Sequence, residues 1–217
     1  MADIFREVDE EVRREQLKRL WERYGYLIVA VCILIVAGVG GWRGYEYWQG
    51  KKAGQTATAY EQAVTLAQAG KYQEADAAFA KIAATGTAGY RVLARLRDAA
   101  ELAQTDKKAA VGAYDSLAAD ASVGRTIEDL AAVRAGLLLV DTDPYADMRK
   151  RLEPLTAADR TFRYTARELL ALSAWKSGDM NAARKWTDMI MTDPQAPAGT
   201  RSRAQILSEL IAASGKG

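Results

Sequence analysis

The strongest constraint on this chain is an uncharged stretch near its N-terminus, which reads YGYLIVAVCILIVAGVGGW from Tyr24 to Trp42. A helix of these 19 residues is roughly 28 Å long, close to the hydrocarbon thickness of a bilayer, about 30 Å. Aromatic side chains, whose rings favour the membrane–water interface, bracket the stretch at Trp21, Tyr24 and Tyr26 and at Trp42, Tyr45, Tyr47 and Trp48. We therefore expect a transmembrane helix with its interface over residues 24–48.

A cleaved signal peptide and a buried core helix fit this stretch less well. The apolar run exceeds the usual signal core of about 7–15 residues, and bulky residues follow it where a cleavage site needs small ones. Core helices rarely stay uncharged over such a length. Cys32 lies in the middle of the stretch and follows Val31, which excludes a lipid-modified cysteine. We expect an inert thiol in apolar surroundings.

The distribution of Lys and Arg predicts the orientation of the span. Six of them lie in residues 4–23, but only three lie in residues 43–62. By the positive-inside rule the N-terminus is cytoplasmic, and residues 49–217 form a domain on the other side. In a Gram-negative bacterium this is a single-pass inner-membrane protein with a periplasmic domain. The absence of cysteine outside the span is compatible with an oxidising compartment.

Residues 1–23 have apolar side chains at helical spacing and three acidic-to-basic pairs four residues apart. We expect a cytoplasmic amphipathic helix that continues into the span. It either lies on the membrane surface and sets the topology, or it docks a partner. Gly40 and Gly44 form a GxxxG pattern, which is a candidate helix-packing face.

Composition excludes most catalytic chemistry. The 217 residues include no histidine and one cysteine, which removes histidine-based catalysis, thiolate metal cages and intrachain disulfides. A net charge of +2 argues against a general nucleic-acid binder. No motif indicates a cofactor or a metal ion, so we expect neither. An enzyme built from carboxylates or lysines alone remains as an alternative, but no spacing suggests a facing pair.

The exported part is rich in helix formers from Gln55 onward, and its four prolines fall in apparent loops. No stretch alternates long enough to predict a strand, so we expect an all-α domain. Two segments share a pattern of Gly, an apolar residue and Ala: GKYQEADAAFAKI (70–82) and GDMNAARKWTDMI (178–190). Weaker copies cover residues 105–117 and 145–155. The key alanines are Ala75, Ala110, Ala146 and Ala183, at intervals of 35, 36 and 37 residues.

That period is close to the tetratricopeptide repeat (TPR) of about 34 residues, a pair of antiparallel helices. Glycine suits the tight turn, a small residue lets the helices approach, and an apolar plug fills the gap to the next pair. One pair cannot bury its apolar face, so we expect stacked pairs, an α-solenoid, in preference to a generic helical bundle. Pro154 interrupts the second helix of the third pair, and Thr126–Asp129 resembles a capping box.

Three segments together resemble one bacterial family: DIFREVDEEVRREQLKRLWERYG (3–25), the span, and ARELLALSAWKSGDMNAARKWTDMIMTD (166–193). The combination is similar to the YfgM-like family, an ancillary subunit of the SecYEG translocon with a TPR-like domain. The resemblance implies a non-catalytic protein that works with the Sec translocon and a periplasmic chaperone. Such a protein helps exported client proteins to leave the channel. It implies no catalytic residues.

The binding surface of such a domain is expected on the first helix of each pair. Counting back from the turn glycine places four candidate groove residues there: Tyr60, Arg95, Glu168 and Trp175. Aromatic and Arg side chains are favoured anchors for protein partners. The alternatives are a core position for Trp175 and a solvated surface for Arg95 and Glu168. The sequence therefore predicts a membrane-tethered TPR scaffold at the Sec translocon, with envelope assembly or cell division as the alternative task.

Overall fold

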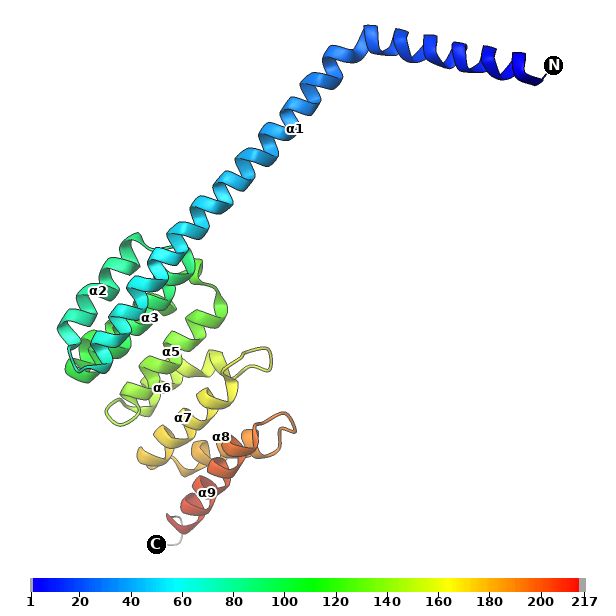
Figure 1. The fold of residues 1–217 in the computed structure, drawn as a ribbon. Coiled ribbons are helices and arrows are strands. Elements are labelled where there is room, and N and C mark those ends of the chain that lie inside the picture. Colours follow the sequence, from blue (N-terminus) through cyan, green and yellow to red (C-terminus); the bar gives the residue numbers. More distant parts are fainter. Residues whose placement is uncertain (1, 215–217) are drawn as a thin grey trace. The chain divides into compact units, whose positions relative to one another are not determined.

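The computed structural model describes the backbone of residues 2–214 and the side chains of Arg14, Lys18 and residues 21–213 (Figure 1). Over residues 2–214 the chain forms helices and no strand, which confirms the predicted all-α fold. The chain divides into two compact units, Met1–Gln55 and Thr56–Gly217. The boundary lies inside one helix, α1 (Ala2–Gln68).

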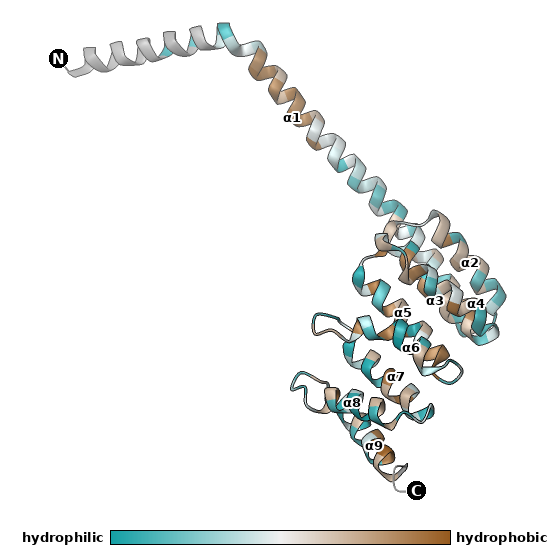
Figure 2. Cartoon of the chain, turned by 180° about the vertical axis from the view of Figure 1, so that it is seen from behind, coloured by the Kyte–Doolittle hydropathy of each residue, from teal (hydrophilic) through white to brown (hydrophobic). Residues whose placement is uncertain are grey.

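The first unit exposes the apolar stretch of α1. Its large apolar side chains lie on the surface, from Leu27 to Val39, and Figure 2 shows this stretch in brown. A contiguous apolar surface of this kind is unfavourable in water and favourable in lipid. The described part of the chain has one helix long and apolar enough to cross a membrane. The predicted amphipathic face over residues 1–23 falls mostly on side chains outside the described residues.

Up to residue 214, the second unit comprises the end of α1, eight further α-helices and two short 3-10 helices. Their bounds are α2 (Tyr72–Thr85), α3 (Ala88–Thr105), α4 (Lys107–Ala118), η1 (Ala121–Val123), α5 (Arg125–Leu139), α6 (Tyr145–Leu152), η2 (Glu153–Thr156), α7 (Arg163–Lys176), α8 (Met180–Met191) and α9 (Ala198–Ser214).

These helices pack mainly on their neighbours in sequence, so that helix pairs stack one on the next (Figure 1). Four pairs follow in order: the end of α1 with α2, α3 with α4, α5 with α6, and α7 with α8, and α9 closes the array. In addition, α7 contacts both α5, the first helix of the preceding pair, and the closing helix α9. This arrangement confirms the predicted helical-repeat fold.

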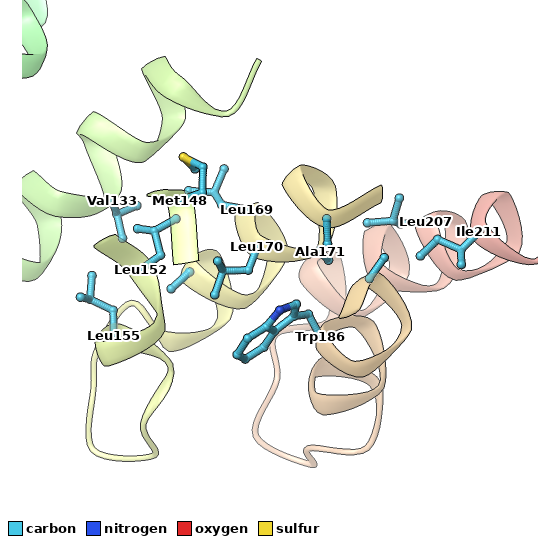
Figure 3. Close-up of a cluster of buried hydrophobic side chains, with 13 residues drawn as sticks. Val133, Met148, Leu152, Leu155, Leu169, Leu170, Ala171, Trp186, Leu207 and Ile211 are labelled. Atoms are coloured by element: carbon cyan, nitrogen blue, oxygen red, sulfur yellow. The ribbon is translucent and has the colours of Figure 1, made fainter. Parts of the chain in front are cut away.

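The core runs through the array as separate apolar clusters rather than as one centre. The first cluster surrounds Phe79 between α1, α2 and α3, and the next surrounds Tyr114 between α3, α4 and α5. The largest surrounds Trp186, which is 2% exposed, and draws side chains from α5 to α9 (Figure 3). The indole N–H of Trp186 donates to the hydroxyl of Tyr145 at 2.9 Å, which satisfies its polar edge.

The first and last pairs turn in the same way, at the two predicted glycines. Gly70 has a φ of 76° and Gly178 a φ of 80°, in the left-handed region that glycine tolerates best. The amide of Lys71 donates to Leu66 O at 3.0 Å, and the amide of Asp179 donates to Ala174 O at 2.9 Å. This Schellman geometry satisfies the last carbonyls of the first helix and starts the second.

The third pair departs from the predicted register. Ala146 is exposed, so its assignment as the key small residue was wrong. Met148 and Leu152 are fully buried and point into the largest cluster (Figure 3). Gly136 of the facing helix α5 is the small contact residue instead. A β-carbon at this position would lie only 3.1 Å from the Leu152 side chain, which is closer than ordinary contact. As predicted, helix α6 ends before Pro154, which lies in η2.

The start of α5 also differs from the prediction. The N-cap is Gly124, with a φ of 85°, so Thr126 lies inside the helix and the predicted capping box is wrong. Asp129 instead accepts a hydrogen bond from Arg160 at 2.9 Å. Because Asp129 is buried, this ion pair compensates a charge that would otherwise be costly there.

Candidate functional site

The four candidate residues lie on first helices of their pairs, as the sequence predicts. Tyr60 is on α1, Arg95 is on α3, and Glu168 and Trp175 are on α7. Whether they form one binding groove stays a prediction. The contacts of each residue show which part of its side chain a partner could reach.

Tyr60 is half-buried at the first helix pair. Its ring meets Phe79 edge-on, with 5.6 Å between ring centres, and lies 5.7 Å from the ring of Tyr90. Such aromatic pairs contribute about 0.5–1.5 kcal/mol beyond their buried area. Tyr60 therefore joins α1, α2 and α3, and any partner would reach only its exposed part.

Arg95 is tied to the loop that follows α4. Its guanidinium donates to Asp120 Oδ2 at 2.6 Å, and both side chains are partly exposed. Asp120 also accepts hydrogen bonds from the amide and hydroxyl of Ser122, at 3.1 Å and 2.6 Å. These bonds from Ser122, followed by Arg95, lower the pKa of Asp120 to about 2. Arg95 thus orients the turn at η1.

Glu168 and Trp175 both contribute to the packing around α7. Glu168 accepts two hydrogen bonds from Arg203 of α9, one of them at 2.9 Å, and this pairing raises the pKa of Arg203. A two-point pair of this kind fixes the relative orientation of both groups. Trp175 is half-buried against the largest apolar cluster. Its exposed edge is the part that a partner could contact.

Sequence reasoning missed two exposed apolar side chains on first helices. Leu93 on α3 is 46% exposed and Leu137 on α5 is 45% exposed. Exposed leucines are common singly, but these two occupy successive first helices of the repeat array. The sequence offers no clear signal for them, because Leu137 lies in a run of three leucines and Leu93 follows Val92.

The sequence also gave no signal for Arg167, which is only 6% exposed in α7. Its guanidinium donates to Thr156 O at 2.9 Å and to Met189 O at 3.0 Å, and it pairs with Asp193 at 3.4 Å. It therefore satisfies carbonyls at the C-terminal ends of two helical segments, η2 and α8. Arg167 thus links the end of the third pair to the fourth pair.

The described residues hold no group of three or more His, Cys, Asp or Glu side chains that could bind a metal ion. On α3, burial, followed by Asp76 of α2, raises the pKa of Asp98 to about 7. Two carboxyl groups can exchange a proton. No nucleophile or charged partner accompanies them among the groups that act on Asp98.

Comparison with known proteins gave one family match. The sequence pattern of the tetratricopeptide repeat-like domain fits residues 18–193. The matched region begins before the apolar stretch and ends after α8, so it includes that stretch and all four helix pairs. No curated protein and no solved structure matches significantly.

Proposed function

Because the chain belongs to the tetratricopeptide repeat-like domain family, whose domains generally bind other proteins and are generally not catalytic, we propose that it is a membrane-anchored scaffold. One observation carries the proposal: a single helix, α1, contains both the apolar stretch and the first helix of the repeat array. Tethering raises the effective concentration of a weak binder near a membrane partner by orders of magnitude.

The proposed location is the bacterial inner membrane, with the N-terminus in the cytoplasm and the repeats in the periplasm. The excess of Lys and Arg before the span supports this orientation. Cys32 is the only cysteine in the sequence. In a Cys32→Ser background, a single new cysteine therefore reports the side of the membrane on which it lies. Ser116 on α4 and Lys18 are both exposed and serve as the two probes.

In spheroplasts, a membrane-impermeant maleimide should label the Ser116→Cys variant at once. It should label the Lys18→Cys variant only after the membrane is permeabilised. The opposite pattern would place the repeats in the cytoplasm and contradict the periplasmic location. Labelling of both probes before permeabilisation would contradict a spanning helix.

The proposed partners are Sec translocon subunits, a periplasmic chaperone and the exported clients between them. Support for these partners comes from the resemblance carried by residues 3–25, the apolar stretch and residues 166–193. The family match supports protein binding in general. The candidate contact surface comprises the exposed parts of the first helices, including Leu93, Leu137 and Trp175.

In vivo photocrosslinking tests this assignment. Probes are placed at Leu137 and Trp175 on first helices and at Gly40 in the span, with Lys81, exposed on the second helix α2, as the matched control. Recovery of translocon subunits or a periplasmic chaperone from the first-helix or span probes, but not from Lys81, supports the proposal. Recovery of only cell-wall or division proteins would favour the alternative scaffold for envelope assembly or cell division.

A further inference from the structure

Two successive first helices, α3 and α5, each expose one leucine beside one arginine. Leu93 and Arg97 are four residues apart on α3, and Arg134 and Leu137 are three residues apart on α5. Side chains at these spacings are neighbours on one face of a helix. Both leucines are nearly half exposed, the side chain of Arg97 is 40% exposed, and Arg134 is exposed. We call these four residues the Leu–Arg face.

The two halves of the Leu–Arg face lie at the same level of the stack. Helix α4 packs on both α3 and α5, and its Tyr114 shares one buried cluster with Ala99 of α3 and Ala135 of α5. Arg97 lies two residues before Ala99, and Arg134 lies one residue before Ala135. Consistently, burial raises the pKa of Tyr114, and Arg134 and then Arg97 partly oppose this rise. Both guanidinium groups therefore lie near one phenol ring.

The Leu–Arg face carries positive charge that the chain itself leaves largely available. Arg134 pairs with no carboxylate among the described side chains. The Nε atom of Arg97 lies 2.8 Å from Glu101, but Glu101 is buried, and a guanidinium has five N–H donors in all. Exposed guanidinium groups bind carboxylates in two-point geometry, which makes them favoured anchors for acidic side chains.

The order of the four side chains sets the pattern of a ligand. Because α4 reverses the chain between them, α3 and α5 run in the same direction. Leu93 therefore lies one turn before the level of the two arginines and Leu137 one turn after it. With a rise of 1.5 Å per residue and neighbouring helices about 10 Å apart, the two leucines are roughly 15 Å from each other. An extended chain covers this distance in about four or five residues.

We propose that the Leu–Arg face binds an internal segment of a partner protein in which acidic residues stand between two apolar ones. The arginines take the carboxylates, and the leucines take the apolar side chains on both sides. Because apolar contacts flank the cations in both directions, the ligand chain continues past them, and no terminal carboxylate is needed. The inference rests on the proposed scaffold function and names the chemistry that two of its first helices recognise.

Fluorescence anisotropy with the full chain in nonionic detergent micelles tests the proposal. The probe is a fluorescein-labelled, C-terminally amidated peptide with the central sequence Leu-Asp-Glu-Asp-Leu. Its neutral counterpart carries Leu-Asn-Gln-Asn-Leu. At low salt the acidic probe should bind about ten-fold more tightly than the neutral one, and the difference should shrink at about 0.5 M salt. The acidic probe with a free C-terminal carboxylate should bind within about two-fold of the amidated one.

Two charge reversals on neighbouring helices form a matched pair. Arg134→Glu should weaken the acidic probe by about ten-fold and the neutral probe by no more than about two-fold. Arg91→Glu makes the same change in net charge at another exposed arginine. It lies on α3, roughly 160° around the helix from Leu93, and should weaken neither probe by more than about two-fold. Leu137→Ser should weaken both probes alike, by about three-fold. Circular dichroism checks that each variant keeps its helix content.

Equal binding of the acidic and neutral probes would overturn the proposal, and so would equal losses in Arg134→Glu and Arg91→Glu. Binding that requires the free C-terminal carboxylate would overturn the internal segment. If no probe bound while Leu137 still crosslinked to a partner protein in vivo, the scaffold function would stand and this inference would fail. Probe binding without any crosslink from the first helices would instead count against the scaffold function.

Discussion

Replacing Gly178 by alanine isolates the contribution of backbone conformation at a repeat turn. Its φ is 80°, and a β-carbon built at this position meets no atom within 4 Å. The cost is therefore conformational and not steric, about 1–2 kcal/mol for an L-residue in the left-handed region. Alanine also reduces the freedom of the unfolded chain, which offsets about 0.4–1 kcal/mol. The expected net loss of unfolding free energy is about 1 kcal/mol.

Gly112 provides the matched control, because it is also exposed and a β-carbon there also meets nothing within 4 Å. It lies inside helix α4, where alanine is favoured over glycine by about 0.5–1 kcal/mol. The same substitution should therefore stabilise the protein at this position. The two variants should differ by about 2 kcal/mol with opposite signs relative to wild type.

Urea unfolding of the full chain in detergent micelles measures both effects. The signal is tryptophan fluorescence, to which the buried Trp186 contributes as one of five tryptophans. Gly178→Asn should recover part of the loss, because asparagine tolerates the left-handed region better than alanine. Gly70, with a φ of 76° and the same turn, should behave like Gly178. If alanine at position 178 stabilised the protein as it does at position 112, the turn geometry described above would be refuted.

Four further substitutions test the packing of the later repeats by the same unfolding measurement. Met148→Ala should cost about 2–4 kcal/mol, whereas Ala146→Ser should stay within about 0.5 kcal/mol; equal effects would contradict the shifted register of the third pair. Gly136→Val should cost about 1–3 kcal/mol, because its side chain enters the space of a fully buried leucine, and an unchanged midpoint would contradict that contact. Arg203→Ala should cost no more than about 1 kcal/mol, because its pair with Glu168 is partly exposed; a larger loss would mean that the pair is buried.

The sequence was sufficient for the long apolar helix, the all-α class and the two end repeats. An uncharged stretch of membrane length has few alternative folds, and Gly70 and Gly178 mark turns that other residues adopt only with strain. The third pair was misplaced because it has no turn glycine to fix the register. In an alanine-rich helix many positions resemble the small contact residue, and here Met148 fills the place that Ala146 was expected to take.

The sequence predicted on which helix each candidate residue lies, but not which side chains it contacts. Helical spacing placed Arg95 and Glu168 on first helices, as found, but their partners could not be anticipated. Asp120 is 25 residues from Arg95, and Arg203 is 35 residues from Glu168. Such pairings depend on which helices stack in space. A periodic sequence pattern does not show which side chains of stacked helices meet.

The packing of each helix on its neighbours in sequence also determines how the domain can acquire its structure during synthesis. Contacts within and between adjacent pairs join segments a few tens of residues apart, a topology of low contact order. Each pair can therefore form soon after its second helix has been synthesised, because no helix from the far end of the described chain is needed to complete it. During synthesis, exposed apolar surface of the repeats is thus largely restricted to the pair made last, so the earlier pairs need not stay unfolded until the later ones are complete.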